Sequence, residues 1–101
     1  MNEKTIIKRI NENEKRFDLI KENIDKLSFE LEKFKSNKKE LDLLNKYYES
    51  KKWVNDKDMY ENNNIPKIKA GILSEDAIWN LNEDINDLIN EMNDVILSFN
   101  K

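Results

Sequence analysis

Apolar residues recur every seven positions through the first half of this chain, and this repeat restricts the possible folds more than any other feature of the sequence. Such a heptad is typical of a helix that packs along its length against another helix. Its a and d positions, which we call the apolar seam, hold Ile6, Ile10, Phe17, Ile20, Ile24, Leu27, Leu31, Phe34, Leu41 and Tyr48. A single Gly and a single Pro in the chain also favour long helices. We therefore predict a helix over about residues 4–49.

Polar residues interrupt the apolar seam at Asn13, Lys38 and Asn45. Buried polar residues at such positions commonly fix the register of paired helices, although Lys38 could equally lie where the seam meets solvent. The segment KSNKK, residues 35–39, is the most favourable place for a kink, because Ser and Asn compete for backbone hydrogen bonds. The heptad phase continues across this segment, which predicts that the helix is continuous.

The last quarter of the chain has the same kind of period. Apolar residues step by three or four from Ile78 through Leu81, Ile85, Leu88, Met92 and Val95 to Phe99. This spacing predicts a helix over about residues 75–99. Ile89 and Ile96 widen its apolar stripe beyond a simple two-helix seam, so this helix is expected to have more than one neighbour.

The start of this last helix is well marked. Ser74 is a favourable N-cap, and Glu75 and Asp76 follow it at the positive end of the helix dipole. Leu73 and Ile78 have the spacing of a hydrophobic staple. An ordinary helix N-terminus therefore explains every residue of this segment.

The residues between the two long helices hold the only Pro and the only Gly. We predict a short helix over about residues 51–61 and a connector over residues 62–73. Pro66 suits the first position of a single helical turn, and Gly71 is expected to close that turn in a left-handed conformation.

These elements predict an all-α fold in one domain, residues 1–101. Its architecture is a long antiparallel helical hairpin, similar to a coiled coil, with the short middle helix forming a partial three-helix bundle. The last helix can cover only about half of the first at the shared rise per residue. Exposed apolar stripes usually mark an association surface, unless the first helix bends back on itself. We therefore expect a homodimer formed through Ile6, Ile10, Phe17, Ile89 and Ile96.

Two stretches of the sequence resemble a family of small bacterial proteins of unknown function. The first is YYESKKW at residues 47–53, with the pattern Tyr-Tyr-x-Ser-x-x-Trp, and the second is IPKIKAGILSEDAIWNL at residues 65–81. Ile72 replaces the Val that is typical of the family, and Ala70 stands where a basic residue is common. The resemblance implies a helical fold and a bacterial origin, and it implies no activity.

The composition excludes several classes of function. The chain has no Cys and no His, which removes disulfides, thiolate metal sites and the commonest general base. No apolar run approaches the roughly 18–20 residues that span a bilayer, and the charged N-terminal segment does not resemble a signal peptide. Basic and acidic residues nearly balance in residues 1–49, so no basic face for a nucleic acid is expected. We expect a cytoplasmic protein that binds neither membrane nor nucleic acid and uses no cofactor.

An acidic last helix offers one enzymatic alternative. Glu83, Asp87 and Glu91 follow one another at intervals of four, and helical carboxylates can bind Mg²⁺ or Mn²⁺. A metal-dependent all-α hydrolase is therefore the alternative function. Glu83 and Asp87 point away from the apolar stripe, however, which is typical of a solvated acidic face, and we assign no catalytic or metal-binding residue.

Aromatic residues concentrate near the connector, at Tyr47, Tyr48, Trp53, Tyr60 and Trp79. Tyr and Trp suit interfaces because each combines a large apolar area with one polar group. They could form a pocket for a partner, or they could fill the end of the helical bundle. The sequence as a whole favours a non-enzymatic, self-associating protein–protein interaction module whose protein partner it does not name.

Overall fold

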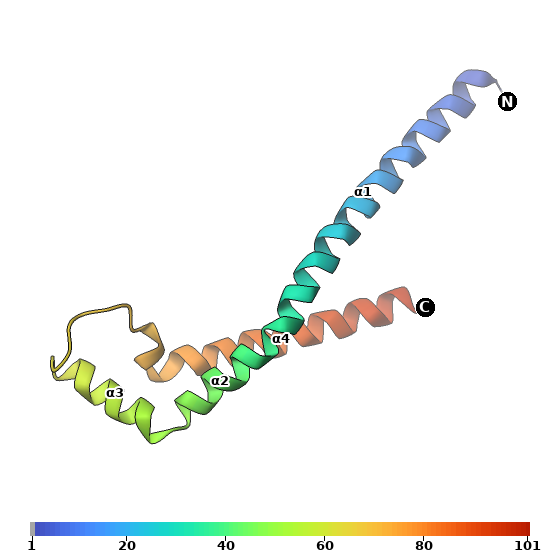
Figure 1. The fold of residues 1–101 in the computed structure, drawn as a ribbon. Helices are drawn as coiled ribbons and strands as arrows, with labels where there is room; N and C mark the ends of the chain where they lie inside the picture. Colours follow the sequence, from blue (N-terminus) through green and yellow to red (C-terminus); the bar gives the residue numbers. More distant parts are fainter. Residues whose placement is uncertain (1) are drawn as a thin grey trace. The chain divides into compact units, whose positions relative to one another are not determined.

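The computed structural model describes residues 2–101, and the prediction of an all-α fold is confirmed because these residues contain no β-strand. The elements follow in the order α1 (Glu3–Ser36), α2 (Lys38–Tyr48), α3 (Lys51–Glu61), the short 3₁₀ helix η1 (Gly71–Leu73) and α4 (Glu75–Phe99), as Figure 1 shows. The backbone divides into two compact units, one that ends at Leu41 and one that spans Asp42–Lys101. The prediction that the whole chain forms one domain stays a prediction.

The helix α1 is 34 residues long and buries none of its side chains. The Asn2 side chain caps its start by accepting a hydrogen bond of 2.9 Å from the Thr5 N–H. Five ion pairs at spacings of three or four residues follow its surface: Lys8–Glu12, Lys21–Asp25, Lys26–Glu22, Lys33–Glu30 and Lys35–Glu32. Exposed pairs of this kind stabilise a helix only weakly, by about 0.2–0.5 kcal/mol each.

A one-residue turn at Asn37 separates α1 from α2, so the long first helix predicted over about residues 4–49 is present but bends at this position. The interruption lies inside the KSNKK segment and has the cause expected there. The Ser36 hydroxyl donates to the Lys33 carbonyl oxygen at 2.8 Å and competes with the backbone ladder. Asn37 keeps a right-handed helical backbone, with φ −75° and ψ −9°, and its carbonyl accepts from the Leu41 N–H at 2.9 Å. Helical hydrogen bonding therefore resumes at once.

Within the second unit, the end of α2 and the start of α4 run antiparallel. Tyr48 contacts Glu75, whereas Asn45, one turn earlier in α2, contacts Asn82, about two turns later in α4. The Asn82 side-chain amide donates to the Asn45 side-chain oxygen at 3.0 Å and to the Ile78 carbonyl at 2.9 Å. The polar residue Asn45 on the apolar seam thus has a polar partner, which fixes the register of these two helices.

The helix α3 is capped at both ends by side-chain and backbone chemistry. The Ser50 hydroxyl accepts from the Trp53 N–H at 3.4 Å and starts the helix. At the other end Asn63 has φ 59°, in the left-handed region. Its N–H donates to the Tyr60 carbonyl at 3.2 Å, and the Asn64 N–H donates to the Met59 carbonyl at 2.9 Å. This pair of bonds is a Schellman motif with Asn in the place that Gly most often takes.

The predictions that Pro66 starts a helical turn and that Gly71 closes it in a left-handed conformation are wrong. Residues 66–70 form no helical turn, and Gly71 does not have a positive φ. The left-handed residue that ends a helix here is Asn63, which tolerates this conformation because its short polar side chain can hydrogen-bond locally. Gly71 instead opens η1, which is closed by the Ser74 N–H donating to the Gly71 carbonyl at 3.1 Å.

The core of the second unit is small. In the described part of the chain only Trp53 and Ile78 are buried, with 9% and 2% of their surface exposed. Half-buried residues of the same unit come from α2, η1 and α4 and include Leu44, Tyr48, Leu73, Ala77 and Ile85. A unit of this size buries a limited apolar area, so each contact of Trp53 matters for its stability.

Candidate functional site

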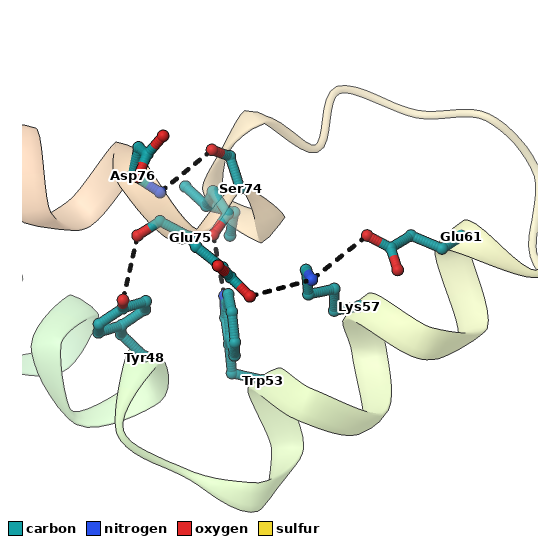
Figure 2. A network of polar contacts seen from close by, with 8 residues as sticks. Tyr48, Trp53, Lys57, Glu61, Ser74, Glu75 and Asp76 are labelled. Atoms are coloured by element: carbon teal, nitrogen blue, oxygen red, sulfur yellow. Dashed lines mark hydrogen bonds and ion pairs between the residues drawn. The ribbon is translucent and has the colours of Figure 1, made fainter.

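Trp53 is the centre of the aromatic residues that the structure brings together. Its indole N–H donates to the Ile72 carbonyl oxygen at 2.9 Å, which joins α3 to η1. The Tyr48 ring meets the Trp53 ring edge-on, with the ring centres 5.0 Å apart and the planes at 70°. This is a favourable geometry for an aromatic pair. Figure 2 shows Trp53 on α3 with its side chain directed towards the segment that leads into α4, and Tyr48 of α2 to one side of it.

The start of α4 is held by bonds from α2 and from its own cap. The Tyr48 hydroxyl donates to the Glu75 carbonyl oxygen at 3.1 Å. The Ser74 hydroxyl accepts from the Asp76 N–H at 3.3 Å and is the N-cap of α4 (Figure 2). Leu73, which precedes the cap, is half-buried. These contacts fix where α4 begins relative to α2 and α3.

Lys57 links α3 to α4 across the face of Trp53. Its ammonium nitrogen lies 3.4 Å from a Glu61 carboxylate oxygen, 3.6 Å from one of Glu75 and 5.8 Å from the centre of the Trp53 ring (Figure 2). The hydrogen bond to Glu61, together with the charges of Glu61 and Glu75, raises the pKa of Lys57. Lys57 therefore stays charged at neutral pH and is a poor candidate for a base.

Tyr47 binds Asp56 at the corner between α2 and α3. The Tyr47 hydroxyl donates to Asp56 Oδ2 at 2.6 Å, a short bond that is typical of a hydroxyl on a carboxylate. This hydrogen bond, with smaller contributions from burial and from the Asp56 charge, raises the pKa of Tyr47 to about 12. The phenol is thus a hydrogen-bond donor throughout the neutral range, which suits a structural role.

The two other aromatic residues of the predicted cluster, Tyr60 and Trp79, are not part of the group around Trp53. The Tyr60 hydroxyl donates to the Ile68 carbonyl oxygen at 3.1 Å, and the Lys67 ammonium lies 4.5 Å from the Tyr60 ring centre. Trp79 leaves 62% of its surface exposed. Trp53 therefore fills the interior of the unit, and among the five aromatic residues of the predicted cluster Trp79 is the one that remains exposed.

The residues predicted for self-association are all exposed. Ile6, Ile10 and Phe17 lie on α1, and Ile89 and Ile96 lie on α4. Phe17, at 64% exposure, is the clearest case because a ring of this size is seldom left in water without a partner. Along α1 the exposed apolar seam continues through Ile20, Ile24, Leu27 and Leu31.

The acidic residues do not converge on one point. Within residues 2–101 no group of three or more Asp or Glu side chains is arranged to hold a metal ion. The alternative of a metal-dependent hydrolase therefore gains no support from the side-chain arrangement.

Several residues of the site were missed by sequence reasoning. The spacing of Lys57 and Glu61, four residues apart on a helix, signals their ion pair. The Tyr47–Asp56 bond and the Ile72 carbonyl under Trp53 have no comparable signal, because they depend on how the chain turns after α2 and after the connector.

The fold and these contacts define an all-helical domain. A family model described as a domain of unknown function, DUF4298, matches residues 10–95, and the chain belongs to this family. The resemblance to a family of unknown function is thus confirmed. No curated protein and no solved structure matches the chain. None of the helices in the described residues is long and apolar enough to cross a membrane.

Proposed function

We propose that this protein is a non-enzymatic helical interaction module that self-associates as a homodimer through the apolar seam of α1. The observation that carries the proposal is the exposed seam from Ile6 to Leu31 on a helix that buries no side chain. As part of the same proposal, we place the protein in the bacterial cytoplasm.

The length of α1 supports a partner on its seam. Helices in proteins derive most of their stability from packing an apolar face, and local propensity alone is marginal in water. The ion pairs of α1 described above are all exposed, and each contributes only a few tenths of a kcal/mol. A second helix on the seam supplies the missing apolar contact. Ile89 and Ile96 of α4 offer a second exposed apolar face for the same assembly.

The non-enzymatic character rests on what the polar groups do. Lys57, Tyr47 and Ser74 each have a partner within the second unit that accounts for their position. Groups of this kind fix helix ends and corners, and none is directed at a shared point where a substrate atom could sit.

The oligomeric state measured at several concentrations tests the proposal. Size exclusion coupled to light scattering is expected to give a dimer for the native chain. Phe17→Glu is expected to give a monomer, because it buries a charge in the seam. Leu19→Glu is the matched control: Leu19 is 70% exposed on the same helix but lies outside the seam, so this variant is expected to remain a dimer. A native chain that stays monomeric, or two variants that behave alike, would refute self-association through the seam.

A further inference from the structure

We infer that two copies of α1 pair antiparallel, with the two-fold axis between residues 18 and 19, so that Arg9 of each copy faces Glu30 of the other and Glu14 faces Lys21. This inference rests on the proposed self-association and adds its orientation and register. It follows from the charges that flank the exposed apolar seam.

The register first satisfies the apolar residues of the seam. In an antiparallel pair of helices each a position lies opposite a d position of the partner, because one chain runs backwards. Here Ile10 lies opposite Leu27, Phe17 opposite Ile20, and Leu31 opposite Ile6. The overlap extends from residue 3 opposite residue 34, which is nearly the whole of α1 (Glu3–Ser36).

Asn13 is the polar residue of this seam, and the register places it opposite Ile24. Its side-chain amide already donates to the Arg9 carbonyl at 2.8 Å, and its side-chain oxygen accepts from Arg16 at 3.3 Å. The polar atoms of Asn13 are thus satisfied within their own helix. An apolar neighbour across the interface leaves neither of them without a bond.

The charges beside the seam then select this arrangement. Antiparallel helices bring g positions against g positions and e positions against e positions. In this register Arg9 faces Glu30 and Glu14 faces Lys21, and the two-fold axis repeats each pair. In each remaining flanking pair at least one residue is neutral: Arg16 faces Asn23, and Ile7 faces Ser28. No like charges meet, which is the complementarity that sets orientation between helices.

The competing arrangements all bring like charges together. A parallel pair in register places Arg16 opposite Lys21, although Arg9 then meets Glu14 and Glu30 meets Lys35. Sliding the antiparallel pair by one heptad in one direction places Lys21 opposite Lys21, although Arg16 then meets Glu30. Sliding it in the other direction places Arg16 opposite Arg16 and Glu14 opposite Glu14. Like charges that face each other across an interface disfavour that pairing.

The ion pairs within α1 leave this arrangement possible. Lys21 pairs with Asp25 at 2.9 Å and Glu30 with Lys33 at 3.6 Å, and all four side chains are more than half exposed. Exposed pairs of this kind hold their partners weakly, so Lys21 and Glu30 can also reach across to a second helix.

A charge-swap cycle tests the orientation. Arg9→Glu and Glu30→Arg alone are each expected to weaken dimerisation by about tenfold, because each replaces two attractive pairs by two repulsive ones. The double variant is expected to recover nearly the native affinity. In a parallel dimer the double variant instead opposes like charges at Glu14 and at Lys35, and it stays weak. Lys15→Glu, on the outer face of the same helix, is the control and is expected to leave the affinity unchanged.

Distances between spin labels give an independent readout, because the native chain has no cysteine. Labels on Lys8→Cys are expected about 30 Å apart along the helix axis, and labels on Asp18→Cys about 2 Å apart along it. The antiparallel register is overturned if the two labels of a dimer show little axial separation at both sites, or if the affinity of the double charge-swap variant stays weak. Either result leaves self-association standing. A native chain that is monomeric in light scattering overturns the proposed function itself.

Discussion

Replacing Trp53 by Phe tests whether this one side chain holds the second unit together. Phe keeps an aromatic ring on α3 but has no N–H, so the Ile72 carbonyl oxygen loses the hydrogen bond that Trp53 donates at 2.9 Å. The edge-on contact with Tyr48 is also reduced, because the smaller Phe ring does not reach as far as the indole ring, whose centre lies 5.0 Å from the Tyr48 ring centre.

The expected loss of stability follows from these two changes. Removing a part-buried hydrogen bond of this kind costs about 0.5–1.5 kcal/mol. The smaller ring removes roughly one further kcal/mol of buried apolar surface. We expect the free energy of unfolding to fall by about 1.5–2.5 kcal/mol, which lowers the melting temperature by roughly 6–20 °C for a unit of this size.

Thermal and urea unfolding followed by far-UV circular dichroism measure this loss at one fixed protein concentration, because association changes apparent stability. Trp79→Phe is the matched control. Trp79 is exposed, so its replacement is expected to change the free energy of unfolding by less than about 0.5 kcal/mol. If the two variants unfold within 0.5 kcal/mol of each other, roughly the error of such a comparison, then Trp53 does not organise this unit.

Three further substitutions test the turns on either side of α3 and the start of η1. The Asp56 hydrogen bond holds the pKa of Tyr47 at about 12, above the ordinary value of 10.0, so its stabilisation is complete below pH 10 and is lost as the pH rises through 12. Tyr47→Phe is therefore expected to cost about 1 kcal/mol in urea unfolding at pH 7, and the difference from the native chain should shrink between pH 10 and 12; a difference that does not vary with pH contradicts this. Asn63→Ala is expected to destabilise by about 1 kcal/mol because φ is 59° there. Gly71→Ala should stabilise by about 0.5 kcal/mol because an added Cβ meets nothing within 4 Å and φ is not positive; a destabilised Gly71→Ala would instead indicate a left-handed residue at that position.

The parts of the fold that follow from local chemistry could be predicted from the sequence. The period of apolar residues placed α1, α2 and α4, and the N-caps Ser50 and Ser74 mark where two helices begin. An N-cap is readable because a single side chain satisfies a backbone group two or three residues away. The kink at Asn37 was located correctly by the same reasoning. The size of the bend depends on how the Ser36 hydroxyl and the Asn37 N–H, which both donate to the Lys33 carbonyl oxygen, share that acceptor.

The connector could not be predicted in the same way. Three successive Asn residues offered several equivalent ends for α3, and only tertiary contacts decide which of them becomes left-handed. Once Asn63 has taken that conformation, the chain needs no second left-handed residue at Gly71. The bonds from Trp53 to Ile72 and from Tyr60 to Ile68 then hold the connector through backbone carbonyls, which every residue type carries and which therefore leave no mark in the sequence.

The two Asn residues of the apolar seam suggest why a single heptad pattern serves two kinds of contact. Asn45 has a polar partner on another helix, because Asn82 donates to it across the antiparallel contact of α2 and α4. Asn13 is satisfied by the backbone and by Arg16 of its own helix. A seam residue that needs a polar partner can pair only where that partner is present, as Asn45 does within this chain. A seam residue satisfied by its own helix accepts an apolar neighbour, which is what the proposed second copy of α1 presents as Ile24. The seam is thus specific where it contacts α4 and permissive where we propose that it dimerises, and there the flanking charges must supply the specificity.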